Sequence, residues 1–167
     1  MKKIIVGITV LIVFSMSLAF AQVDEWSLRI GVKRIDERYR DSHNYIGTSM
    51  DAFAYYDVKD LPEPPTSPSG LCLYFPHSDW SFMPGRYASD IRSPIMDRET
   101  FEFVVEAGED TQLTLFWPNM GEVPQGYGFL LIDEEREIFI DMKAAAEYTF
   151  DCRPEHKNRF RIVVENR

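Results

Sequence analysis

The amino-acid sequence predicts an all-β protein, and specifically a two-layer antiparallel β-sandwich. Apolar and polar side chains alternate along most of the chain after residue 25, with the period of two that is typical of strands. Short turns rich in Gly, Pro, Asp and Glu separate these stretches, and no stretch has a convincing helical period. Many short strands joined by such turns are typical of a sandwich or a barrel, and we expect the sandwich.

The first 21 residues have the three parts of a secretory signal peptide. Two lysines precede an uncharged apolar run, residues 4–20, and the small-residue pattern Ala-Phe-Ala occupies residues 19–21. A transmembrane anchor is the alternative, but a span needs about 20 mostly apolar residues and this run is slightly short. We therefore expect cleavage after Ala21 and export of the remaining 146 residues to the periplasm or the extracellular space, with no membrane span in the mature protein.

The charge of the mature chain limits its partners. Without the two lysines of the signal peptide it has 16 basic and 27 acidic residues, a net charge of −11. An acidic surface keeps an exported protein soluble and argues against nucleic acid or an anionic membrane as a partner. It is compatible with divalent cations, although a solvated acidic face is the commoner explanation.

Two predicted strands lie in the first half of the chain. Residues 26–33 alternate apolar side chains with Ser, Arg, Gly and Lys. Residues 71–75 alternate Leu and Phe with Cys72 and Tyr74. Between them, residues 61–70 contain four prolines, which favour a stiff, extended backbone.

Six further strands are predicted in the second half. Residues 127–132 are nearly all apolar, which is typical of a strand covered on both faces, whereas the others alternate. The predicted strands of this half are residues 101–105, 113–117, 127–132, 138–140, 148–150 and 160–164. For the core we expect Phe103, Leu115, Trp117, Leu130, Phe160 and Ile162.

The proline-rich segment decides the number of domains. A single strand cannot bury its apolar face alone, so we expect residues 26–33 to join the sheet formed by later strands. Residues 61–70 are then a crossover between sheets, and residues 22–167 form one domain with its main sandwich at 71–165. The alternative is a disordered arm followed by a domain that starts near residue 69.

The last part of the chain resembles a known group of modules. The run LTLFWPNMGEVPQGYGFLLID, followed by IDM, YTF and RFRIVV, is similar to bacterial secreted fibronectin-type-III-like or immunoglobulin-like modules, over residues 100–164. In those modules a strand ending in Trp is followed by a Pro-rich turn, a Tyr-bearing strand and a hairpin. The resemblance implies an Ig-like sandwich that acts as a spacer, assembly part or binding platform, and not an enzyme.

The connection at residues 76–94 is the main candidate site. Loops of this length are usually functional or disordered, and its aromatic residues disfavour disorder. It either folds over one end of the core or presents a surface to a protein partner or a cell-surface glycan. In the second case Trp80 and Tyr87 supply flat apolar faces, while Asp79, Arg86, Asp90 and Arg92 supply directed hydrogen bonds. We expect an exported structural or interaction module, with a carbohydrate-binding module as the alternative.

Other chemistry has weaker support. The three histidines are far apart, and no nucleophile elbow, phosphate-binding loop or dinucleotide fingerprint is present, so we expect no catalysis and no cofactor. Asp51, Asp57 and Asp60 offer oxygens for a structural calcium ion, with turn capping as the alternative. Cys72 and Cys152 either form a disulfide between strands or remain two separate reduced thiols.

Overall fold

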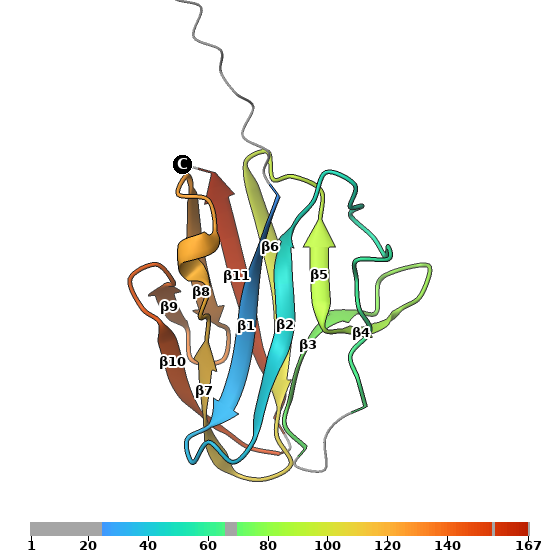
Figure 1. The fold of residues 1–167 in the computed structure, drawn as a ribbon. Coiled ribbons are helices and arrows are strands. Elements are labelled where there is room, and N and C mark those ends of the chain that lie inside the picture. The colour runs from blue at the N-terminus through green and yellow to red at the C-terminus, as the bar shows by residue number, and fades with distance from the viewer. Residues whose placement is uncertain (1–24, 66–69, 155, 167) are drawn as a thin grey trace, which may run out of the picture.

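The computed structural model describes residues 25–65, 70–154 and 156–166, and these residues form two β-sheets packed face to face (Figure 1). The predicted signal peptide lies outside the described residues. One sheet has five strands in the order β10-β7-β1-β2-β5, and the other has six in the order β4-β3-β6-β11-β8-β9. Among the described residues no helix is long and apolar enough to cross a membrane.

The strands of each sheet come from distant parts of the chain. The five-stranded sheet consists of β1 (Trp26–Arg34), β2 (Arg40–Thr48), β5 (Ser89–Arg92), β7 (Thr111–Phe116) and β10 (Glu147–Cys152). The six-stranded sheet consists of β3 (Cys72–His77), β4 (Gly85–Tyr87), β6 (Arg98–Glu106), β8 (Tyr127–Asp133), β9 (Ile138–Asp141) and β11 (Asn158–Asn166). One 3₁₀ turn, η1 (Met120–Glu122), interrupts the connection from β7 to β8.

All eight predicted strands are present, and three more, β2, β4 and β5, were not predicted. β4 and β5 have only three and four residues, too few to show a period, and β2 begins with five polar residues. Every strand pair is antiparallel except β2 with β5. The expectation of a wholly antiparallel sandwich is therefore wrong at this pair, where the chain returns to the first sheet after passing through the second.

The core lies between the two sheets and is rich in aromatic rings. Phe103 and Phe160 stack with their centroids 5.1 Å apart, and Phe150 from the opposite sheet meets Phe160 edge-on at 5.0 Å. Five of the six predicted core residues are buried, but the prediction is wrong for Leu130. Its neighbours Phe129 and Leu131 occupy the inward positions of β8, so Leu130 faces the outer side of the sheet.

The proline-rich connection lies between β2 of one sheet and β3 of the other, and β1 pairs with β7. Residues 60–63 close the side of the sandwich beside β4 and β5. The Ala88 amide donates to the Leu61 carbonyl at 2.7 Å, and the Glu63 amide donates to the Arg86 carbonyl at 2.9 Å. These bonds occupy backbone groups that would otherwise form an open sheet edge.

The two cysteines are separate reduced thiols, so the structure has the second of the two predicted alternatives. Cys72 lies with Tyr74 and Val104 in a small cluster on the outer face of the six-stranded sheet. Cys152 lies in the main core, where the Asn158 amide nitrogen is 3.0 Å from its sulfur. Burial raises the pKa of the Cys152 thiol. The two side chains lie in different clusters on opposite faces of the six-stranded sheet, so the disulfide is not formed.

Candidate functional site

Two loops meet at the edge of the sandwich beside β4 and β5, at the right of Figure 1. The first, residues 49–61, follows β2, and the second, residues 78–84, precedes β4. Tyr56 joins the loops, since its ring centroid lies 5.8 Å from that of Phe82 and 6.2 Å from that of Trp80. The two loops therefore form one surface.

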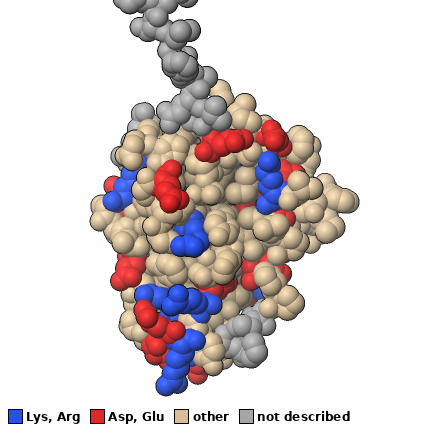
Figure 2. Space-filling view, viewed as in Figure 1, with Lys and Arg blue, Asp and Glu red and all other residues tan. Residues whose placement is uncertain are grey.

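This surface is unusually apolar. Twelve large hydrophobic side chains are exposed among the described residues, and seven of them belong to these two loops. We call these seven the aromatic patch: Met50, Phe53, Tyr55, Val58, Leu61, Phe82 and Met83. Figure 2 shows charged side chains of both signs distributed over the visible face, whereas the part that protrudes at the right is mostly neutral.

The first loop is fixed by its own carboxylates. Asp57 accepts hydrogen bonds from the backbone amides of Phe53 (2.8 Å) and Lys59 (2.7 Å). Asp60 is buried and accepts from the amides of Asp57 (2.9 Å) and Ile91 (3.1 Å). Burial raises the pKa of Asp60 more strongly than these amide bonds lower it. The carboxylates thus cap turns of the loop.

The calcium hypothesis gains no support from this geometry. Asp51 is exposed and pairs with Lys59 at 3.6 Å, while Asp57 and Asp60 serve backbone amides. Within the described ranges no group of three or more His, Cys, Asp or Glu converges as a metal site. The arrangement favours turn capping, the alternative for these three aspartates.

The two predicted aromatic residues, Trp80 in the second loop and Tyr87 in β4, lie deeper than a ligand platform requires. Tyr87 is 2% exposed and belongs to the core, and its hydroxyl donates to the Met83 carbonyl. Trp80 is half-buried and stacks on the His77 ring at 3.7 Å, nearly parallel at 7°. The exposed rings of the two loops are those of Phe53, Tyr55 and Phe82. A dense aromatic segment without strand alternation, FAYY at residues 53–56, is the sequence signal that would have indicated them.

Asp90 and Arg92, also predicted as ligand-binding residues, form an internal ion pair. Arg92 donates two hydrogen bonds of 2.8 Å to the buried Asp90 carboxylate, and His77 Nε2 lies 3.2 Å from it. Burial would raise the pKa of Asp90, but His77 and Arg92 hold it below its ordinary value. The Arg92 guanidinium also lies 4.5 Å from the Phe101 ring centroid. This network connects β5, β3 and β6 beneath the loops.

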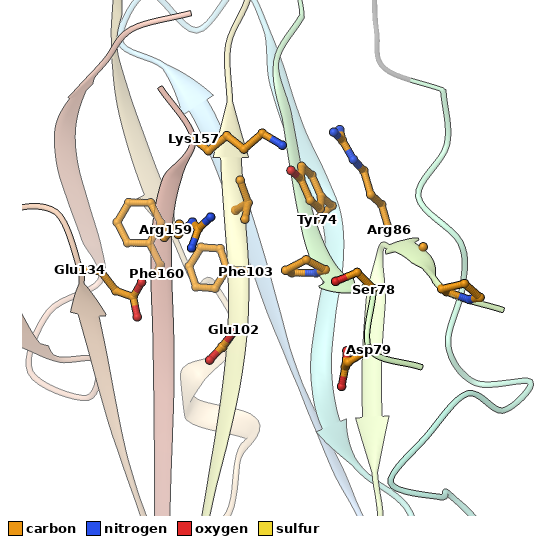
Figure 3. A pocket seen from close by; sticks show the side chains of 14 residues that line it. Tyr74, Ser78, Asp79, Arg86, Glu102, Phe103, Glu134, Lys157, Arg159 and Phe160 are labelled. Atoms are coloured by element: carbon orange, nitrogen blue, oxygen red, sulfur yellow. The ribbon is translucent and has the colours of Figure 1, made fainter. Parts of the chain in front are cut away.

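Asp79 and Arg86, the other two predicted residues, line a groove on the outer face of the six-stranded sheet (Figure 3). The groove has a volume of about 840 Å³ and is called the outer groove below. Strands β3, β6 and β11 form its floor, while residues 78–79, residues 84–86 and Glu134 form its walls. Its polar lining comprises Tyr74, Ser78, Asp79, Arg86, Glu102, Glu134, Lys157 and Arg159.

A carboxylate beside the groove organises one end of it. Glu106 accepts a hydrogen bond from the Tyr74 hydroxyl at 2.8 Å and one from Arg86 at 3.1 Å, and Lys157 lies 3.5 Å away. Burial would raise the pKa of Glu106, but Tyr74 and the two cations lower it below its ordinary value. The Arg86 guanidinium lies over the Tyr74 ring, 4.1 Å from its centroid. Arg86 is therefore held by both a charge and a ring.

No protein-family model, curated protein or solved structure matches this chain. The two surfaces described above, the aromatic patch and the outer groove, are therefore the candidates for function.

Proposed function

We propose that this protein is an exported, non-catalytic interaction module with an immunoglobulin-like or fibronectin-type-III-like sandwich, and that its aromatic patch binds a partner protein. One observation carries the proposal: seven of the twelve exposed large hydrophobic side chains lie in two loops at one edge. Single exposed apolar residues are ordinary on a soluble protein, whereas a gathered set marks an interaction surface.

The composition of the patch favours a protein over a glycan. Phe53 and Tyr55 stack on each other at 5.6 Å and 9°, so each ring covers one face of the other. The remaining members are mainly Met, Val and Leu, which offer irregular apolar volume instead of flat platforms. Aromatic residues and Met are enriched in the buried centres of protein interfaces.

The loops are also prepared to bind without rearrangement. The carboxylates of Asp57 and Asp60 hold the backbone of the first loop, and Tyr87 holds the second through the Met83 carbonyl. A surface that is ordered before binding loses less conformational entropy when the complex forms. Because these carboxylates serve the backbone, they are not poised for acid–base chemistry, which is consistent with a non-catalytic role.

Site-specific photo-crosslinking in the native host tests this proposal. A photoreactive phenylalanine analogue replaces Phe53 or Phe82 in the patch, or Phe139 on β9 at the opposite edge. Phe139 is a matched control, because it is 65% exposed and Phe82 is 67% exposed. We expect the same partner protein to be crosslinked from positions 53 and 82 and not from 139. Equal crosslinking from all three positions, or none from 53 and 82, would contradict the proposal.

A further inference from the structure

The outer groove contains charged side chains that have no hydrogen-bond or ion-pair partner among the described residues. The side chains of Asp79, Glu102 and Arg159 form no hydrogen bond or ion pair with any other described residue. Glu102 and Arg159 lie on the neighbouring strands β6 and β11, and Figure 3 shows them with Asp79 around the groove. Charged side chains of both signs that have no partner in the protein can donate hydrogen bonds to a ligand and accept them from it.

The charge balance argues against an anionic ligand. Two of the three cations, Arg86 and Lys157, already interact with Glu106, so about half of their combined positive charge is offset. The groove lining has three acidic residues, Asp79, Glu102 and Glu134, against three basic ones. The whole chain carries a net charge of −9 as well. A phosphate or nucleic acid would gain little attraction from this surface.

The shape and lining argue against a peptide. None of the twelve exposed large hydrophobic side chains lines the groove, and its aromatic members Tyr74, Phe103 and Phe160 are buried beneath the surface. Peptide and protein partners normally need apolar pockets that anchor a few of their side chains. The groove offers no large exposed apolar side chain, which favours a polar ligand over a peptide.

We propose that the outer groove binds a neutral oligosaccharide, with Glu102 and Asp79 accepting hydrogen bonds from sugar hydroxyls and Arg159 donating to them. A sugar hydroxyl both donates and accepts, so it satisfies unpaired groups of either sign. Hydrogen bonds to a charged partner are shorter and about twice as strong as neutral ones. The volume of about 840 Å³ lies within the range of small-ligand sites and leaves room for more than one sugar ring.

The position of these groups favours such a role. Glu102 and Arg159 project from the two strands that pair over eight consecutive positions, so their backbones are fixed before binding. The site shares Asp79 and Arg86 with the connection at residues 76–94, for which the sequence analysis gave carbohydrate binding as the alternative. The proposed binding position differs from that expectation, because the sugar would lie over the six-stranded sheet and not against Trp80 and Tyr87. The groove shares the loop at residues 78–84 with the aromatic patch, but none of the seven patch residues lines it.

Calorimetry and a glycan array test the proposal with purified protein. The array presents defined neutral oligosaccharides, and the strongest hit is then titrated as a free sugar. We expect saturable binding that Glu102→Gln and Arg159→Gln each weaken by about tenfold or more. Glu147→Gln on β10 and Arg38→Gln after β1 are matched controls, since both are exposed residues of the other sheet or its turn. Neither control should change the affinity.

Three results would overturn the proposal. They are no saturable binding of any array sugar at millimolar concentration, an unchanged affinity in both groove variants, or tighter binding of inorganic phosphate or an acidic sugar than of every neutral one. Thermal unfolding of each variant verifies that it is folded, which is expected because both substituted side chains are exposed. A Phe82→Ser variant separates the two surfaces, since it should lose partner crosslinking and retain sugar binding.

Discussion

The burial of individual side chains is what the sequence predicted least well. Asp90 and Arg92 look like ligand-binding polar residues in a loop, yet the fold buries Asp90 and pairs it with Arg92 and His77. Tyr87 looks like an exposed ring but completes the core. A sequence shows which residue types are present in a loop, whereas burial depends on which distant strands pack against it.

Glu63 is a side chain whose ionisation should change stability. It is half-buried, its Oε2 has no hydrogen-bond partner among the described residues, and burial with the charge of Asp41 raises its pKa to about 7, against the opposing effect of Arg86. The folded state therefore binds the proton more tightly than the unfolded state, whose pKa is about 4.5. The contribution of Glu63 to the free energy of unfolding is fully present below about pH 4.5 and is lost as the pH rises through about 7.

The prediction for Glu63 follows from this sign. Glu63→Gln should raise the free energy of unfolding at about pH 8, where the wild-type carboxyl is ionised, and change it little at about pH 4. Urea denaturation of both proteins at the two pH values measures the difference. Glu137→Gln, an exposed carboxyl in the β8–β9 turn, is the control and should show no such pH dependence. A variant that is less stable at the higher pH would contradict the assignment.

At the scale of elements, strand β2 shows why sequence analysis missed a strand. Its first half is polar, so it shows no period, but Asn44 is fully buried and donates to Asp41 at 2.8 Å. Asp41 in turn accepts from the Leu73 amide of β3 at 2.8 Å. The buried Asn44 nitrogen is thus satisfied within β2 and Asp41 is satisfied from β3, whereas Asn44 Oδ1 has no hydrogen-bond partner among the described residues. Alternation finds strands with apolar faces and misses strands that use such hydrogen bonds.

Gly47 tests how tightly β1 and β2 are packed. A Cβ atom at this position would lie 2.2 Å from the backbone carbonyl oxygen of Trp26 on β1, closer than any real contact. Because that atom belongs to the backbone, relief requires the two strands to separate. Gly47→Ala should therefore lower the free energy of unfolding by about 1–3 kcal/mol, the usual cost of overpacking. Gly121→Ala is the control, since its added Cβ would meet nothing within 4 Å.

The comparison is made by urea denaturation of both variants and the wild type. A Gly47→Ala protein as stable as the Gly121→Ala protein would show that β1 and β2 separate at little cost. The Gly47→Ala variant also bears on the aromatic patch, because residues 49–61 begin where β2 ends. If the strands shift, partner crosslinking from position 53 should fall as well.

For the whole molecule, the sequence predicted the class of fold better than the site. Two sheets and a shared core follow from alternation and turns, which are local signals. The outer groove does not, because its floor comes from strands β3, β6 and β11, and at least twenty residues separate each of these strands from the next. Only the register of those strands brings Glu102 and Arg159 to the same face. Local patterns contain no information on that register.

The proline-rich crossover gives the last prediction, which concerns the integrity of the sandwich. Deleting residues 22–60 removes β1 and β2, which join β7 to β5 in the five-stranded sheet. Trp26, Leu28, Ile30 and Val32 are all buried, and each contributes roughly 1.5–3 kcal/mol. Their sum is comparable to the stability of a typical domain, about 5–15 kcal/mol. We expect the truncated protein to aggregate or to lose cooperative thermal unfolding, measured by circular dichroism.

A melting temperature within about 2 °C of the intact protein would instead show that residues 22–60 are a dispensable arm, contrary to a single domain. The outer groove makes this outcome informative, because all its lining residues come after residue 70. A truncated protein that folds should then still bind the oligosaccharide and should lack Phe53 and Tyr55 of the aromatic patch. Loss of both folding and sugar binding is what the pairing of β1 with β7 requires, since the six-stranded sheet would lose the layer that covers its inner face.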